Sequence, residues 1–301
     1  MRDNPWGNDM RVSTLLIAAM FACAALPARA GDLYAYDASA PLNPVFGKER
    51  VVAKGVVAQD VHFTSTTGHV VTGEIVHGKA AKSRPAILFV HWLGEPKTTN
   101  HTEFEPDAIA LARHGAVSLL IDTMWAKDDW FDTVGKDASA DGPLVEAQVI
   151  DLRRALDLLL DQPGVDPKRV AYVAHDFGAM FGALMANVET RPTAWTLMAG
   201  VPTLAEWYRF GKTKHAWRDY EGYAAAMGRY GITDGLGKLG GKRVLLQFAT
   251  KDYFISQEKA FAFIGAVPGA KTAIFYDTDH ALALPEAAAD RDGWLEKALA
   301  R

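Results

Sequence analysis

The feature of this chain that most restricts its fold is an ordered series of short apolar runs separated by amphipathic segments. Each run has the length and composition of a strand that is buried on both faces of a parallel sheet. The predicted strands are Ala86–His91, Val117–Ile121, Val170–Ala174, Trp195–Ala199, Val244–Ala249 and Thr272–Tyr276. The predicted helices are Pro106–Arg113, Leu144–Asp161, Phe177–Val188, Gln257–Ile264 and Glu286–Ala300. Repeated strand–helix units predict an α/β fold, with a mostly parallel central sheet and helices on both faces.

Two other segments complete this pattern. Residues Val56–Ser65 and Val70–Val76 alternate and are rich in β-branched side chains, with Thr66-Thr67-Gly68 between them, which predicts a hairpin. Residues 201–241 are rich in aromatic side chains and predict a short helical lid. A chain of 301 residues with 49% apolar composition can form one sizeable domain. We therefore expect a linker over residues 31–55 and one domain over residues 56–301.

The N-terminus has the pattern of a signal peptide. Arg11 provides a positive charge, Val12–Leu26 is almost entirely apolar, and Ala28-Arg29-Ala30 fits a cleavage site after Ala30. Met10 directly precedes this segment and is an alternative start. The pattern predicts a signal peptide of residues 1–30 and a periplasmic or secreted protein. The apolar run is short for a permanent membrane span, so no stable membrane insertion is expected after cleavage.

Cysteine content and charge restrict the partners. The one cysteine, Cys23, falls inside the predicted signal peptide, so the mature chain is expected to contain neither a thiol nor a disulfide. A lipid attached to Cys23 is the alternative, although Met20-Phe21-Ala22 matches such sites poorly. The formal net charge of -4 and the lack of a Lys/Arg block argue against nucleic acid and against a polybasic membrane surface. The expected partner is a small-molecule substrate.

The segment Val170–Gly182 has the pattern of a strand, a sharp turn and a helix. This context is the one that a nucleophile elbow of the G-x-S-x-G type requires. Its five positions are occupied by Ala174, His175, Asp176, Phe177 and Gly178. Small residues at both ends let the turn close, and the central residue projects from the carboxyl end of the strand. Asp176 therefore occupies the position where serine is usual.

On these residues the chain resembles the α/β-hydrolase superfamily over residues 56–300. The sequence His175-Asp176-Phe177-Gly178 is similar to the elbow of the epoxide-hydrolase and haloalkane-dehalogenase branches. The superfamily uses the chain order nucleophile, acid, histidine. The resemblance implies that Asp176 is the nucleophile, that Asp252 orients the histidine and that His280 is the general base. The other common position of the acid, Gly200-Val201-Pro202, contains no carboxylate.

The resemblance also implies an oxyanion hole. His91-Trp92-Leu93-Gly94 is similar to the histidine-glycine turn that contributes one backbone amide in this superfamily. The donors expected here are the N–H of Trp92 or Leu93 and the N–H of Phe177. Aromatic residues are expected to line the substrate pocket or its entrance: His91, Trp125, Trp130, Phe131, Trp207, Tyr208, Phe210 and Trp217. For Trp125, Trp130 and Phe131 a place in the core is an equal alternative.

An aspartate nucleophile favours particular chemistry. A carboxylate is ionised at neutral pH and can displace a leaving group from a saturated carbon, which would form an alkyl ester on Asp176. His280 would then activate water to hydrolyse that ester. An epoxide or a halogenated small molecule is therefore the expected substrate. An epoxide would also need an acid from the lid, for which the candidates are Tyr208, Tyr220, Tyr223 and Tyr230.

Two alternatives remain open. The short lid resembles that of dienelactone-hydrolase-like members, which hydrolyse carboxylic esters or lactones, and Asp176 would then act as a base for water. A non-catalytic exported binding protein could reuse the fold, with Asp176 only capping the following helix. The sequence contains no cluster of metal ligands, no phosphate loop and no dinucleotide fingerprint. We therefore expect neither a metal nor an organic cofactor.

Overall fold

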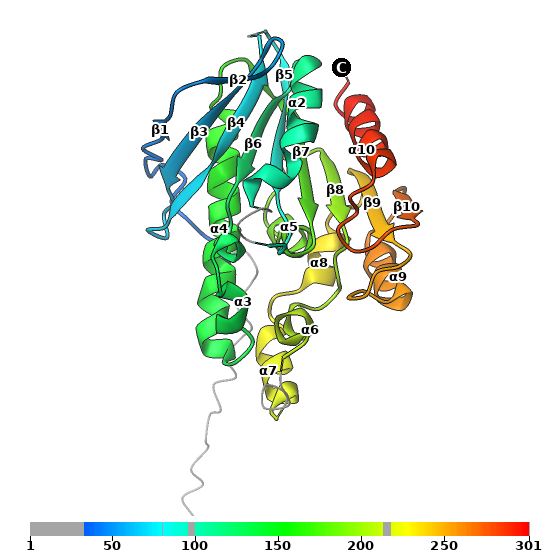
Figure 1. Ribbon diagram of the computed structural model, residues 1–301. Coiled ribbons are helices and arrows are strands. Elements are labelled where there is room, and N and C mark those ends of the chain that lie inside the picture. The colour runs from blue at the N-terminus through cyan, green and yellow to red at the C-terminus, as the bar shows by residue number, and fades with distance from the viewer. Residues whose placement is uncertain (1–32, 80, 96–99, 213–217, 301) are drawn as a thin grey trace, which may run out of the picture.

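The computed structural model describes residues 33–79, 81–95, 100–212 and 218–300. The predicted signal peptide with Cys23, and Trp217 of the lid, lie outside these described residues. The described strands form one ten-stranded sheet, drawn in Figure 1, with the path β1-β3-β4-β6-β5-β7-β8-β9-β10 and with β2 paired to β3. The strands are β1 (Val45–Phe46), β2 (Arg50–Ala53), β3 (Val56–Thr64), β4 (Val70–Gly78), β5 (Arg84–Val90), β6 (Val117–Ile121), β7 (Val165–His175), β8 (Ala194–Met198), β9 (Arg243–Ala249) and β10 (Thr272–Tyr276).

The direction of the strands confirms the predicted fold class. Strands β5 and β6 pair in parallel, as do β5 and β7, β7 and β8, β8 and β9, and β9 and β10. The predicted hairpin is also confirmed, because β3 and β4 pair antiparallel from Val56↔Gly78 to Thr64↔Val70. All residues of β6 and β8 are buried, which explains their continuous apolar sequence.

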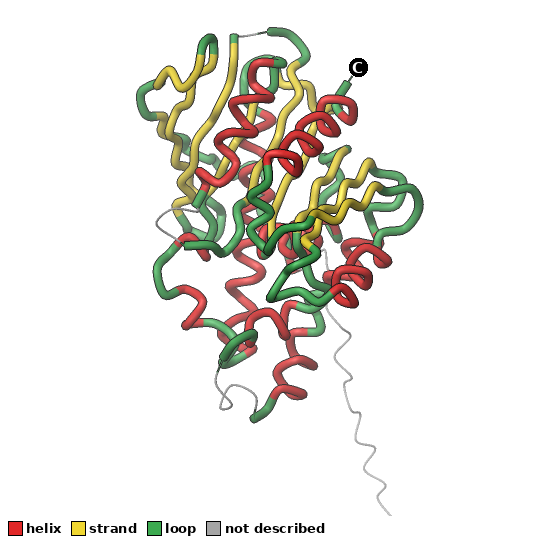
Figure 2. The backbone as a smooth tube through the Cα atoms, turned by 45° about the vertical axis from the view of Figure 1, so that its right-hand side comes forward, coloured by secondary structure: helices red, strands yellow, loops and turns green. Residues whose placement is uncertain are grey.

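Helices cover both faces of this sheet (Figure 2). Helices α2 and α10 contact one another and pack on β4, β6, β8 and β9, whereas α4 and α5 pack together against β5, β6, β7 and β8. The helices are η1 (His101–Phe104), α2 (Glu105–Arg113), η2 (Met124–Ala126), α3 (Trp130–Thr133), α4 (Ala138–Leu160), α5 (Phe177–Ala186), α6 (Leu204–Arg209), α7 (Tyr220–Met227), α8 (Ile232–Gly237), α9 (Gln257–Ala266) and α10 (Pro285–Ala298). Within the described residues no helix is both long enough and apolar enough to cross a membrane.

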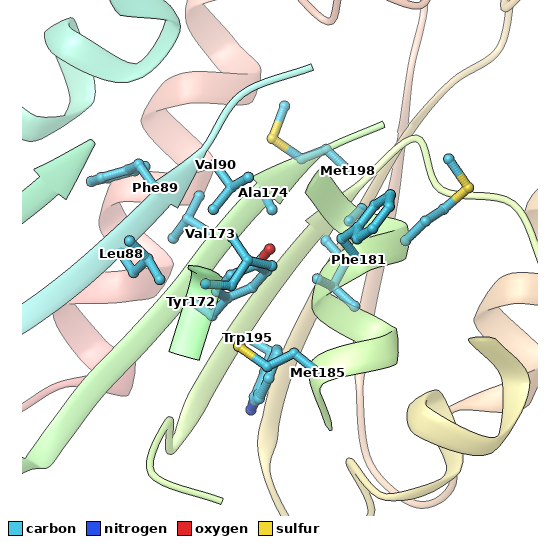
Figure 3. Close-up of a cluster of buried hydrophobic side chains, with 14 of the residues drawn as sticks. Leu88, Phe89, Val90, Tyr172, Val173, Ala174, Phe181, Met185, Trp195 and Met198 are labelled. Carbon is cyan, nitrogen blue, oxygen red and sulfur yellow. The ribbon is translucent and has the colours of Figure 1, made fainter. Parts of the chain in front are cut away.

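The centre of the core lies between β7 and α5. Figure 3 shows Tyr172 and Val173 of β7 beside Leu88 of β5, with Phe181 of α5 nearby. The Tyr172 hydroxyl is buried and donates a hydrogen bond of 2.7 Å to the carbonyl oxygen of Gly178. This bond fixes the first turn of α5 against the strand that precedes it.

Two boundaries differ from the sequence expectation. Strands β1 and β2 lie inside residues 31–55, the expected linker, and both pair with β3. The sheet therefore begins before residue 56. The β-branched Val51 and Val52 favour a strand, and the turn at Gly55, whose φ is +75°, lets the following strand β3 pair with it. Helix α4 begins before Pro143, because the Asp137 side chain accepts the N–H of Ser139 and caps it.

Segments of the lid lie at the carboxyl ends of the parallel strands. In Figure 1, α6 and α7 lie below the sheet, beyond the ends of β7 and β8. Helix α8 packs on α5 and on α9, which joins this region to the main domain. Residues of the loops after β5, β7, β8 and β9 therefore face one another below the sheet.

Candidate active site

Asp176 lies on a strained turn between β7 and α5. Its φ of 52° and ψ of -114° are unusual for a residue with a side chain. Glycine is needed two residues later, because a Cβ at Gly178 would lie 2.5 Å from the carbonyl oxygen of Val90. The turn directs the Asp176 side chain into the site while only 2% of the residue stays exposed. The sequence-predicted elbow is therefore present in geometry, with a carboxylate at its tip.

The expected triad residues come together from three strand ends. His280 Nδ1 lies 2.7 Å from Asp252 Oδ2, and His280 Nε2 lies 4.0 Å from Asp176 Oδ1. Asp252 Oδ1 accepts the backbone N–H groups of Phe254 and Ile255, at 2.8 and 2.9 Å. These bonds hold Asp252 in place, and Asp252 in turn orients the ring of His280 so that Nε2 points toward Asp176.

The two carboxylate oxygens of Asp176 have different partners. Oδ2 accepts the backbone N–H of Leu93 at 3.1 Å, and Oδ1 accepts the indole N–H of Trp207 at 2.7 Å. The backbone N–H of Phe177 also contributes a hydrogen bond that stabilises the carboxylate. Leu93 and Phe177 are thus expected oxyanion-hole donors, and both act on the carboxylate of Asp176 itself.

Burial and charge shift the pKa values of these groups in different directions. Burial raises the pKa of Asp176, although His280, His175 and the two backbone N–H groups oppose the rise. For His280, burial lowers the pKa, but the hydrogen bond to Asp252 and the charges of Asp176 and Asp252 outweigh it, so the net pKa is raised. For Asp252, burial raises the pKa, but the hydrogen bond to His280 and the charge of His280 outweigh burial, so the net pKa is lowered.

Of the two alternative donors in this turn, Leu93 reaches Asp176, whereas Trp92 does not. Its backbone N–H donates to Glu103 Oε2 at 2.8 Å and so is unavailable to Asp176. Glu103 Oε1 lies 2.8 Å from His175 Nδ1, and His175 Nε2 lies 3.0 Å from the carbonyl oxygen of His280. Each ring nitrogen of His175 lies within hydrogen-bond distance of an oxygen atom, so His175 links Glu103 to the backbone of His280 directly behind the site.

Sequence reasoning missed Glu103. It lies in η1, a short 3-10 helix that follows β5, and a single glutamate in such a segment carries no distinguishing pattern. Its importance comes only from the fold, which brings it against His175 at the end of β7. The Trp92 ring stacks on the other side chain of this pair, His175, with 5.2 Å between ring centroids.

A small apolar cavity of about 130 Å³ lies over Asp176 and His280. Three of the expected pocket or entrance residues, Phe131, Trp207 and Phe210, line it. The other lining residues are Trp92, Leu93, Phe177 and Phe254. The volume is comparable with cavities that hold a molecule the size of benzene. The site therefore accepts a small, largely apolar group next to the carboxylate.

Four expected pocket residues do not line this cavity. Trp125 and Tyr208 are almost fully buried, and Trp125 packs on Phe177 with 5.6 Å between ring centroids. Trp130 packs edge-on against Phe177, and His91 accepts from Thr123 through Nε2, so both lie behind the cavity wall. Trp125 and Trp130 take the core alternative, because the unpredicted helices η2 and α3 fold them inward. For His91 and Tyr208 the pocket expectation was wrong.

Metal ligands do not gather in the described part of the chain. Over residues 33–79, 81–95, 100–212 and 218–300, no group of three or more His, Cys, Asp or Glu side chains could hold a metal ion. The chemistry considered below uses side chains and water.

Comparison with known proteins bears on the fold. No protein-family model and no curated protein sequence matches the chain. Among solved structures, an acetyl xylan esterase from Paenibacillus sp. R4 is 16% identical, with a TM-score of 0.71 over 89% of this chain and 92% of that one. Acetyl xylan esterase 1 from Thermoanaerobacterium sp. JW/SL YS485 is 15% identical, with a TM-score of 0.67 over 90% and 92%. The α/β hydrolase GrgF from Penicillium sp. sh18 is 15% identical, with a TM-score of 0.59 over 81% and 99%.

The chain therefore has the α/β-hydrolase fold. At such low identity the likeness establishes the fold and leaves the reaction to be argued from the site. Several of these structural neighbours are named as esterases.

Proposed function

We propose that the protein is a cofactor-independent hydrolase in which Asp176 attacks a saturated carbon and forms an alkyl ester. The observation that carries this proposal is the split environment of the Asp176 carboxylate. One oxygen is held by the Leu93 N–H, and the other lies 4.0 Å from His280 Nε2. A nucleophilic carboxylate needs one oxygen in the oxyanion hole and the other directed at the substrate. Oδ1 accepts the indole N–H of Trp207, which lines the cavity, so this arrangement fits that need.

In the first step, Oδ1 of Asp176 forms a bond to the substrate carbon as the bond from that carbon to its leaving group breaks. The leaving group departs with the electron pair of that bond. Asp176 loses its negative charge, so the indole N–H of Trp207, which donates to Oδ1 before reaction, becomes free to donate to the departing anion. The apolar wall of the cavity excludes water from this step.

In the second step, His280 Nε2 takes a proton from water, and the hydroxide attacks Cγ of Asp176. The negative charge develops on Oδ2, where the N–H of Leu93 stabilises it, and the N–H of Phe177 adds a hydrogen bond to the same carboxyl group. Collapse expels the alkoxide, which takes the proton from His280 and leaves as an alcohol. Asp176 retains one oxygen from water and loses the remaining proton to solvent.

A carbon–halogen bond suits this site better than an epoxide. Halide departure needs no proton, whereas an epoxide oxygen needs an acid as it opens. The candidate tyrosines are engaged or remote: the hydroxyl of Tyr223 donates to Asp141, that of Tyr230 donates to Glu146, and that of Tyr208 is buried away from the cavity. We therefore propose a small halogenated compound as the substrate.

A single turnover in ¹⁸O-labelled water tests this mechanism. With enzyme in excess over 1-bromobutane or a similar haloalkane, the label is expected in the peptide that contains Asp176, and the alcohol product is expected to carry unlabelled oxygen. The Asp176→Ala variant is expected to have no turnover, and His280→Ala is expected to accumulate alkylated Asp176. Label that appears only in the alcohol would show direct attack by water and overturn the proposal.

Carboxylic-ester hydrolysis is the second candidate, supported by the esterases among the structural neighbours. In that reaction Asp176 acts as a base for water, and the substrate carbonyl needs the oxyanion hole. The Leu93 N–H is already used by Asp176 Oδ2, so the carboxylate would have to move. Serine is shorter and leaves this N–H free.

An activated ester separates the two candidates. If the protein is an esterase, p-nitrophenyl acetate is turned over by the parent, and the ¹⁸O label enters acetate. If the alkyl-ester mechanism holds, the parent is inactive on this ester, and Asp176→Ser gains activity because its side chain vacates the oxyanion hole. Asp252→Asn serves as the matched control in each case, since it leaves the residue at the elbow unchanged.

A further inference from the structure

The catalytic cavity shares a wall with a second, larger cavity. Phe131, Phe210 and Phe254 line both the cavity over Asp176, of about 130 Å³, and an outer cavity of about 920 Å³. The outer cavity is open to solvent on the lid side of the three rings. A substrate that enters from this side passes three phenyl rings before it reaches Asp176.

The outer cavity carries an excess of positive charge. Among the described residues, its lining includes the cations Lys136, Arg209, Lys212 and Arg218 and the acidic residues Asp132 and Asp219. Asp219 also caps α7, where its Oδ1 accepts the N–H of Gly222. The whole chain has a formal net charge of -4, so the positive charge of the outer cavity is a local property of the lid.

Arg209 is the most unusual of these cations. It is the last residue of α6 and is only 3% exposed, yet its Nε and Nη1 have no hydrogen-bond partner among the described residues. Its guanidinium lies 4.0 Å from the ring centroid of Tyr223, whose hydroxyl is already bonded to Asp141. The ring offsets only part of the cost of burying a charge without an anion.

Lys212 extends the positive charge to the shared wall. Its ammonium donates to the carbonyl oxygens of Phe131 and Val134 and lies 4.4 Å from the ring centroid of Phe131. These bonds hold it at the boundary between the two cavities. Carbonyl oxygens and a ring satisfy its donors without neutralising its charge.

We propose that the outer cavity binds an anionic group of the substrate, and that the substrate is a carboxylate whose reactive carbon is separated from the carboxylate by a short apolar chain. This inference rests on the proposed function for the reactive end and adds the recognition of the other end. The carboxylate is held by the exposed Lys136 and Arg218, and Lys212 and the buried Arg209 add positive charge behind them, while the chain passes Phe131, Phe210 and Phe254. The cations also offset the repulsion between an anionic substrate and Asp176.

Binding of unreactive probes tests the subsite without relying on turnover. Butanoate, hexanoate and octanoate are compared with the alcohols of the same lengths, by isothermal titration with the purified protein. At least one alkanoate is expected to bind about tenfold more tightly than its alcohol, and added salt is expected to reduce this difference. Equal affinity for acid and alcohol at every length would overturn the proposal.

Charge variants locate the subsite. The exposed pair Lys136→Ala with Arg218→Ala is expected to weaken alkanoate binding and leave alcohol binding unchanged, as is Arg209→Gln if it folds. Lys238→Ala removes an exposed cation of α8 outside both cavities and is the matched control. Unchanged alkanoate affinity in the Lys136/Arg218 pair and in Arg209→Gln would refute the subsite.

Turnover then separates this inference from the proposed function. An ω-bromoalkanoate is expected to have a lower KM than the bromoalkane of equal length in the parent, and this advantage is expected to vanish in the Lys136/Arg218 pair. If alkanoates bind as expected but no bromide is released from either compound, the proposed reaction fails and the anionic subsite stands. If both bromides react equally well, the reaction stands and the subsite fails.

Discussion

His280 lies between two carboxylates, and its charge decides when it can accept a proton from water. Its net pKa is raised above the ordinary value of 6.5, because the bond to Asp252 and the two negative charges outweigh burial. A base must be neutral to act, so hydrolysis of the enzyme ester is limited at a pH below the raised pKa. The same shift stabilises the folded state below pH 6.5, and this contribution is lost as pH rises through the raised pKa.

Turnover is therefore expected to rise with pH and to reach half its maximum above pH 6.5. The measurement is kcat against pH with the best substrate found. Asp252→Asn removes a negative charge and a strong acceptor, so its profile is expected to shift to lower pH and its kcat to fall. A parent profile that is already flat below pH 6 would contradict the assignment of His280 as the base.

Glu103 is expected to act as a positioning residue. It joins the loop of Trp92 to His175, which in turn holds the carbonyl oxygen of His280. Its charge also contributes to the raised pKa of His280. In Glu103→Gln one oxygen remains to replace two acceptors, so either the Trp92 N–H or His175 loses its partner.

The expected result for Glu103→Gln is a kcat lower by about tenfold, as suits the loss of a charged hydrogen bond, with a pH profile shifted to lower pH. Glu105→Gln, two residues along in the first turn of α2, is the matched control and is expected to leave both unchanged. A variant that loses stability but keeps the parent pH profile would assign Glu103 a structural role only.

At the level of elements, the turn between β7 and α5 stores backbone strain at Asp176. A positive φ of 52° is costly for alanine and easily adopted by glycine. Asp176→Ala and Asp176→Gly remove the same carboxylate, so the difference between them isolates the backbone. Both variants are expected to be inactive.

Asp176→Gly is expected to be more stable than Asp176→Ala by about 1 kcal/mol in denaturant unfolding. The control is Ala183→Gly in the middle of α5, where glycine is expected to lower stability by a similar amount. If glycine were no better than alanine at position 176, the turn would not be strained.

The elements also explain which parts of the site could be predicted. Asp176, Asp252 and His280 each follow a parallel strand, and carboxyl ends of such strands meet at one edge, so local pattern and chain order were enough to bring them together. Which aromatic side chains face the cavity and which face the core could not be predicted. Trp125 and Trp207 both lie in segments that follow parallel strands at this edge, but η2 turns Trp125 into the core, whereas α6 points Trp207 at Asp176.

At the scale of the whole molecule, the sheet separates the site from a buried acidic cluster between α2 and α10. Arg291 donates to Asp107 at 2.7 Å through Nε and to Gln247 at 3.2 Å through Nη1. The negative charge of Asp107 also acts on the carboxyl group of Asp292. Such long-range pairs depend on the complete fold. The same is true of the positive charge of the outer cavity and of the contacts of Glu103 with Trp92 and His175, so no pattern in the sequence indicated them.

Burial, followed by the nearby charge of Asp107, raises the pKa of Asp292 to about 7. The folded state therefore binds this proton more tightly than the unfolded chain does, and the resulting stability is lost as pH rises from about 4 through 7. Asp292→Asn mimics the protonated group, so it is expected to raise the free energy of unfolding at pH 8 and to have little effect at pH 5. The measurement is denaturant unfolding of parent and variant at both values, with the exposed Asp279→Asn as control. An equal effect of Asp292→Asn at pH 5 and pH 8 would mean that the two carboxyl groups do not share a proton in the folded protein, and that Arg291 alone compensates their charge.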